Sequence, residues 1–110
     1  MVNEGDLAWI DFSPVRGSEQ GGWRPSIVLT DEAFHTVRST AIVCPITRNM
    51  DPWPTKYPLP QGLVVSGAVL CEQIRLVSRD ERGFKRISSA PRPVLEGVRR
   101  ILGDLLHIQS

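Results

Sequence analysis

Metal-ligating residues are scarce in this sequence, which holds two cysteines, Cys44 and Cys71, and two histidines, His35 and His107. Each cysteine stands alone inside an apolar stretch, without the close Cys or His spacing of a zinc site. The carboxylates are spread singly along the chain, whereas a two-metal nuclease centre needs several that converge. We therefore expect no metal and no cofactor, and two buried thiols that behave as small hydrophobic residues.

Long hydrophobic runs and an excess of one charge are also absent. No apolar run approaches the length of a membrane-spanning helix, and residues 1–6 carry acid where a secretory signal carries base. The expected location is the cytoplasm, without membrane contact. The net charge of +1 excludes a global attraction to nucleic acid. The segment from Arg75 to Arg86 is locally basic and could contact phosphate, but charge alone favours a solvated loop.

The chain has 110 residues, of which 41% are hydrophobic, enough for one domain spanning 1–110 with one modest core. Alternating or continuous apolar patterns predict strands over residues 7–12, 25–30, 40–47, 67–77 and 84–88. Pro45 indicates an edge or a bulge within the third of these. Residues 13–22 are predicted as a polar loop, and residues 49–62 as a proline-rich loop with one short extended piece.

Two further patterns complete the predicted architecture. In the strand over 67–77, a two-residue period places Gln73 and Arg75 on the same face as Cys71, and Glu72 on the apolar face with a buried hydrogen bond. From Pro93 onward, apolar residues follow helical spacing to Leu106. Strands followed by one terminal helix indicate an α+β, mainly β fold: a curled antiparallel sheet or partly open barrel with a C-terminal helix.

Four segments carry a family resemblance: GDLAWIDFSP at 5–14, GSEQGGWRP at 17–25, CPIT at 44–47 and EQIR at 72–75. Their order and spacing resemble the MazF/PemK family of type II toxin–antitoxin systems over nearly the whole chain. The resemblance implies an SH3-like barrel, a homodimer, and a metal-independent endoribonuclease that cuts single-stranded RNA such as mRNA at specific sequences. It also implies inhibition by a cognate antitoxin. In the family, the arginine of the R-P pair and the threonine of P-I-T form the reaction centre, which places it at Arg24 and Thr47 here.

The chemistry suits these residue types. RNA is cut without a metal when its own 2′-hydroxyl attacks the neighbouring phosphorus, which requires charge neutralisation and two proton transfers. Arg24 offers a planar set of donors to the phosphoryl oxygens, and Thr47 offers a hydroxyl. The glutamate of G-S-E-Q affects activity in some family members and corresponds to Glu19. Glu19 is a more natural general base than Arg24, because an arginine side chain keeps its proton in proteins, but the sequence leaves the identity of the base open.

Further residues are candidates for RNA binding, and each has a structural alternative. The set consists of Arg16, Ser18, Gln20, Trp53, Gln73 and Arg75. Trp53 and Trp23 could stack on unpaired bases, but Trp23 could instead pack in the core or in the dimer. Because the loop over 49–62 helps choose the RNA sequence in the family and has its own sequence here, base preference does not carry over.

Two alternative functions remain at this point. The first is a non-enzymatic gyrase poison on the same fold, resembling the CcdB branch, which acts through C-terminal residues including a tryptophan. This chain ends without a tryptophan and keeps the arginine–threonine pair, which disfavours the poison. The second is an inactive SH3-like binding module, which leaves the G-S-E-Q-x-G-x-R-P loop without a role.

Overall fold

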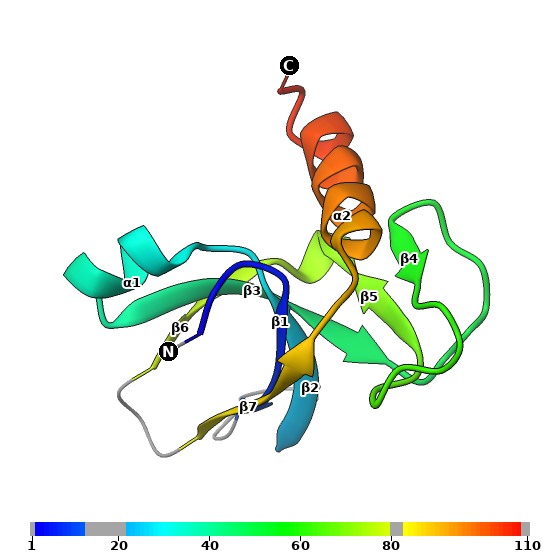
Figure 1. Ribbon diagram of the computed structural model, residues 1–110. Coiled ribbons are helices and arrows are strands. Elements are labelled where there is room, and N and C mark those ends of the chain that lie inside the picture. Colours follow the sequence, from blue (N-terminus) through cyan, green and yellow to red (C-terminus); the bar gives the residue numbers. More distant parts are fainter. Residues whose placement is uncertain (1, 13–21, 80–82, 109–110) are drawn as a thin grey trace.

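The computed structural model describes residues 2–12, 22–79 and 83–108, and within them strands dominate (Figure 1). The strands are β1 (Asp6–Asp11), β2 (Trp23–Val28), β3 (Thr40–Thr47), β4 (Lys56–Pro58), β5 (Ala68–Leu70), β6 (Arg75–Ser78) and β7 (Phe84–Ser89). The helices are α1 (Glu32–Val37), the short 3-10 helix η1 (Cys71–Gln73) and α2 (Arg92–Leu105). None of the helices in these ranges is both long and apolar enough to span a bilayer.

The strands form an antiparallel sheet that curls without closing, in the order β4-β5-β3-β2-β1-β7. The long strand β3 has two partners on its second side: β6 pairs with Thr40–Val43 and β5 pairs with Ile46 and Thr47. Pro45 lies where β3 changes from one partner to the other, which suits a residue that cannot donate a ladder hydrogen bond. The predicted α+β fold, an open antiparallel barrel with a C-terminal helix, is confirmed.

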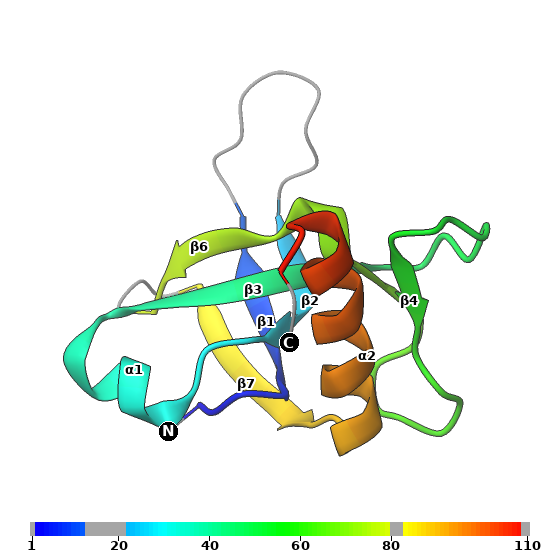
Figure 2. The ribbon, with the colours of Figure 1, turned by 90° about the horizontal axis from the view of Figure 1, so that it is seen from above.

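The hydrophobic core lies on both faces of β1. Leu7 belongs to a cluster that α2 covers, whereas Ala8 and Ile10 belong to a second cluster with Val28 and Val43. Figure 2 shows α2 lying across the sheet, with α1 and the loop between β3 and β4 at opposite ends of the molecule. The helix contributes Val94, Val98 and Leu102 to the first cluster, each with less than a tenth of its surface exposed. Burial of side chains this large contributes about 1.5–3 kcal/mol each, so α2 holds the open sheet in shape.

The segment predicted as one strand over 67–77 is divided, and this prediction was wrong in its middle. The chain leaves β5 at Leu70, makes the η1 turn and resumes as β6 at Arg75. The two-residue alternation therefore fails: Cys71 is fully buried while Gln73 is exposed. Glu72, expected on the buried face, is exposed instead.

Helix α1 was not predicted from the sequence. Asp31 caps its first turn by accepting the backbone N–H of Phe34 at 2.9 Å. At its other end, Arg79 donates to the carbonyl oxygens of His35 and Arg38. The His35 ring is buried and bonds the Val2 carbonyl and the Thr30 hydroxyl, which makes it a structural residue.

Candidate active site

Arg24 and Thr47 are brought together by the pairing of β2 with β3. The two strands pair with Ser26 opposite Pro45, and continuing this register by two residues places Arg24 opposite Thr47. Arg24 is held on its other side by β1, where it pairs with Ile10. The two side chains thus stand on central strands of the sheet, which gives them a rigid base.

Two pockets meet at this pair of residues. The first, with a volume of about 590 Å³, is lined by Arg24, Thr47 and Asn49 together with Gln73 and Arg75. The second pocket, about 510 Å³, is also lined by Arg24, Thr47 and Asn49. Arg24 and Thr47 therefore lie at the junction of the two pockets, where a chain running through both would pass over them.

The first pocket is electropositive. Burial, followed by repulsion from Arg75, lowers the pKa of Arg24 from its usual value. The Arg75 guanidinium lies 4.8 Å from the centre of the Phe12 ring, a cation–π contact that directs it. Within the described residues neither arginine has an ion-pair partner. Two guanidinium groups facing one pocket favour an anion such as a phosphate.

Lys56 also lines the first pocket and was missed from the sequence. Its ammonium group donates to the carbonyl oxygens of Asn49 and Asp51 at 3.0 and 2.9 Å. Asn49 in turn donates its backbone N–H to the Thr47 hydroxyl at 3.1 Å. Lys56 thus adds positive charge to the pocket and fixes the loop that touches Thr47. A single lysine in a proline-rich loop gives no sequence signal for either role.

The structure assembles some of the predicted site residues and leaves others apart. Arg24, Thr47, Gln73 and Arg75 line one pocket, as a common site requires. Trp53 does not line it, although the neighbouring Lys56 does. The predicted residues Arg16, Ser18, Glu19 and Gln20 lie in the segment 13–21, outside the described residues.

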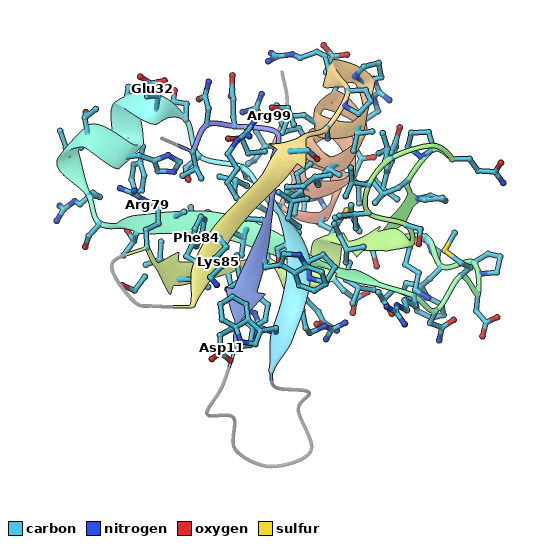
Figure 3. All side chains as sticks on the ribbon, turned by 60° about the horizontal axis from the view of Figure 1, so that its bottom comes forward. Asp11, Glu32, Arg79, Phe84, Lys85 and Arg99 are labelled. Atoms are coloured by element: carbon cyan, nitrogen blue, oxygen red, sulfur yellow. The ribbon has the colours of Figure 1, made fainter. Side chains whose placement is uncertain are left out.

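The basic segment from Arg75 to Arg86 does not act as one patch in the described residues. Of the basic residues of this segment that the structure describes, only Arg75 lines the first pocket. Figure 3 shows Arg79 near α1, where it bonds backbone carbonyls, and Lys85 on β7, where its ammonium lies 5.7 Å from the centre of the Trp23 ring. Arg86 pairs with the buried Asp6 at 3.0 Å. Because successive residues of this segment face different elements, its charges are dispersed.

The family is decided by the comparison with known proteins. Residues 3–106 match the model of PemK-like, MazF-like toxins of type II toxin–antitoxin systems. The chain belongs to this toxin family. The endoribonuclease toxin MazF of Escherichia coli strain K12 is 33% identical over 79 residues, covering 72% of this chain and 70% of that protein. The predicted class, a MazF/PemK endoribonuclease toxin, is confirmed.

Solved MazF structures have the same fold. A MazF crystal structure from Deinococcus radiodurans superposes with a TM-score of 0.88 at 38% identity, covering 96% of each chain. A MazE–MazF structure from the same organism gives 0.88 at 37% identity, covering 98% of this chain and 97% of that one. The open sheet and the terminal helix are therefore those of MazF toxins.

The second pocket of this MazF-like chain has an apolar rim. Trp9, Trp23 and Val64 line it and are 41%, 46% and 78% exposed. Single exposed apolar residues are ordinary, but three around one pocket mark a contact surface. Trp23 is therefore not a core residue.

Metal ligands do not converge in the part of the chain that the structure describes: no three His, Cys, Asp or Glu residues form a group. Both cysteines are free and fully buried, as predicted. Burial raises the pKa of the Cys44 thiol to about 12 and that of Cys71 to about 11. Neither thiol is poised as a nucleophile, since the reactive form is the thiolate.

Proposed function

We propose that this endoribonuclease toxin cuts single-stranded RNA at specific sequences without a metal, by attack of the RNA 2′-hydroxyl on the adjacent phosphorus. The observation that carries the proposal is that Arg24 and Thr47 stand together where two pockets meet. If the scissile phosphate lies at that junction, the nucleotides on its two sides would place their bases in the two pockets. The cationic first pocket supports an RNA backbone there.

The reaction would proceed in one displacement. The 2′-oxygen loses its proton to a base and bonds to phosphorus, the bond to the 5′-oxygen breaks, and that oxygen takes up a proton. The products are a 2′,3′-cyclic phosphate and a 5′-hydroxyl. Arg24 would neutralise the charge that builds on the phosphoryl oxygens, and it stays protonated at neutral pH despite its lowered pKa. Glu19 remains our candidate for the base.

Thr47 would assist as a donor. Its oxygen already accepts the backbone N–H of Asn49. That bond uses one acceptor site of the oxygen and leaves the hydroxyl proton free to donate into the pocket that Thr47 and Arg24 both line. Two donors, one charged and one neutral, would then face the same phosphoryl group.

The test is cleavage of RNA by the purified protein, with mapping of the new 5′ ends. The wild-type protein should cut at a defined sequence. Arg24→Ala should cut about 10²–10³-fold more slowly, as when an oxyanion-hole donor is deleted. A folded Arg24→Ala protein that cuts at the wild-type rate would remove Arg24 from the reaction. Intact RNA after incubation with wild-type protein would instead favour the gyrase poison or the inactive binding module.

We also infer a homodimer, because 110 residues offer little surface for gripping several nucleotides. Two exposed apolar surfaces support it: the rim of the second pocket, and Leu105, Leu106 and Ile108 at the end of α2. Light scattering at micromolar concentration should give twice the mass of the chain. A monomeric mass in a sample that cuts RNA would refute the dimer.

A cognate antitoxin is the remaining proposed partner, acting in the cytoplasm. Solved relatives include a MazE–MazF complex. The first pocket, with Arg24, Lys56 and Arg75, would attract an acidic antitoxin segment as it attracts RNA. The antitoxin peptide and RNA should therefore compete, and simultaneous independent binding would contradict a shared site.

A further inference from the structure

The loop that leads from β3 to β4 is fastened to η1 by one carboxylate. Glu72 Oε1 accepts the indole N–H of Trp53 at 3.1 Å and the hydroxyl of Thr55. The backbone N–H of Cys71 donates to the Thr55 carbonyl at 3.1 Å. The end of the loop and the η1 turn are therefore linked by three hydrogen bonds.

Trp53 keeps its ring open to solvent despite this bond. The side chain is 61% exposed. Because the Glu72 carboxylate occupies its one polar group, Trp53 cannot read the edge of a base by hydrogen bonding. Its ring faces remain available, and a fixed aromatic face stacks on any unpaired base.

The position of Trp53 adjoins the cationic pocket. Lys56, whose backbone N–H donates to the Trp53 carbonyl at 3.0 Å, lines that pocket. Gln73, the residue after Glu72, lines it too. The segments that carry Trp53 and Glu72 thus continue directly into the pocket's lining.

We propose that Trp53 is a stacking platform for one base of the bound RNA, and that Glu72 is the positioning residue that holds it in place. This rests on the proposed function. Gln73 has an amide that both donates and accepts and can discriminate base edges, whereas Trp53 supplies stacking without edge discrimination. A protein segment is the competing occupant, but the cationic pocket lined by Lys56, three residues along the chain from Trp53, and the exposed indole ring match a nucleotide better.

Binding is tested by the indole N–H signals in an NMR spectrum. The chain has three tryptophans, so Trp53→Phe assigns the signal of Trp53. The probe is an RNA oligonucleotide of the mapped cut sequence with one 2′-deoxy nucleotide at the cut, and the same oligonucleotide with an abasic nucleotide at each position in turn. The Trp53 signal should shift on binding, and one abasic position should abolish that shift and weaken binding about 5- to 150-fold. An unmoved Trp53 signal in the saturated complex would overturn the proposal.

The role of Glu72 is tested by measuring how much the abasic nucleotide at that position lowers kcat/KM, a loss called here the abasic penalty. Glu72→Leu removes the acceptor and should abolish most of the penalty. Glu72→Gln keeps a carbonyl acceptor and should retain it. Thr55→Val removes the other donor to the same oxygen and serves as the matched control, with the penalty kept. A purely structural Glu72 would change the denaturation midpoint while leaving the penalty intact, which would refute the positioning role.

These outcomes are separate from failure of the proposed function. If the wild-type protein cuts no RNA, the endoribonuclease proposal fails, and the same NMR titration with a random-sequence single-stranded RNA oligonucleotide still decides whether the Trp53 signal shifts on RNA binding. If the wild-type protein cuts RNA and Trp53→Ala shows the full abasic penalty, the stacking proposal fails alone.

Discussion

The hydroxyl of Thr47 accepts the backbone N–H of Asn49 at 3.1 Å, at the point where β3 ends. This bond uses an acceptor site of the hydroxyl and leaves its proton to donate. We predict that Thr47→Val lowers kcat about 10-fold, the value of one neutral hydrogen bond of about 1.4 kcal/mol. Thr47→Ser keeps the hydroxyl and should retain most of the activity. Single-turnover cleavage measures both, and equal rates for the two variants would exclude a donor role.

Gly67 packs closely against the backbone of Thr47. Its φ is +131°, and a Cβ added there would lie 2.2 Å from the Thr47 carbonyl oxygen. Gly62 also has a positive φ, +93°, but a Cβ there would meet nothing within 4 Å. Gly62→Ala should therefore cost about 1–2 kcal/mol of stability with normal cleavage.

Gly67→Ala should cost more stability than Gly62→Ala and lower kcat on the order of 10-fold, because Thr47 must shift. Urea denaturation and single-turnover cleavage of the two variants check this. If Gly67→Ala cuts at the same rate as Gly62→Ala, the placement of Thr47 does not limit the reaction.

Arg75 should contribute one phosphate contact. With a non-cleavable single-stranded oligonucleotide, the slope of log K against log salt should become less steep by about 0.7 in Arg75→Gln. Arg100 is exposed on α2 and lines neither pocket, so Arg100→Gln is the control with an unchanged slope. Equal slopes for the wild-type protein and Arg75→Gln would place Arg75 away from the phosphates.

The acid stability of the fold should depend on Asp6. Burial alone would raise the pKa of this carboxyl, but hydrogen bonds from the Asn3 backbone, Arg86 and Ser89 outweigh it and lower the pKa. Since the folded pKa is below the unfolded value of about 3.9, the stabilisation is complete above the unfolded pKa and is lost as the pH falls below it through the lower, folded pKa. The difference in unfolding free energy between the wild-type protein and Asp6→Asn should be largest near pH 7.

That difference should shrink below about pH 4 as Asp6 becomes protonated. Urea midpoints measured between pH 3 and pH 7 test this. Parallel curves for the wild-type protein and the variant would show that Asp6 contributes no pH dependence.

Local sequence patterns predicted most of the sheet and the terminal helix. They failed where contacts between residues far apart in the sequence determine the secondary structure. Residues 67–77 alternate like one strand, yet the change of partner along β3 at Pro45 leaves room for the η1 turn. Glu72 was assigned to the wrong face for that reason. Helix α1 is six residues long and depends on Arg79, more than forty positions away from His35, so its own sequence is a weak signal.

The site was predictable to a similar extent. Arg24 and Thr47 were proposed as site residues from the family resemblance, and the register of β2 and β3 explains why those two segments lie together. Lys56 could not be predicted as a site residue, because its role depends on the loop carbonyl groups to which it donates hydrogen bonds after folding. The dispersal of Arg79 and Arg86 likewise follows from their partners and not from their spacing in the sequence.

The most direct test of the account is the fate of an RNA oligonucleotide with one 2′-deoxy nucleotide on the 5′ side of the cut, compared with its all-ribose form in excess EDTA. The account predicts that the all-ribose RNA is cut at full rate, with a 5′-hydroxyl on one product and a 2′,3′-cyclic phosphate or its 3′-phosphate hydrolysis product on the other. The deoxy form should bind with similar affinity and stay intact. Cleavage of the deoxy form, 5′-phosphate ends, or loss of activity in EDTA would contradict attack by the RNA's own 2′-hydroxyl.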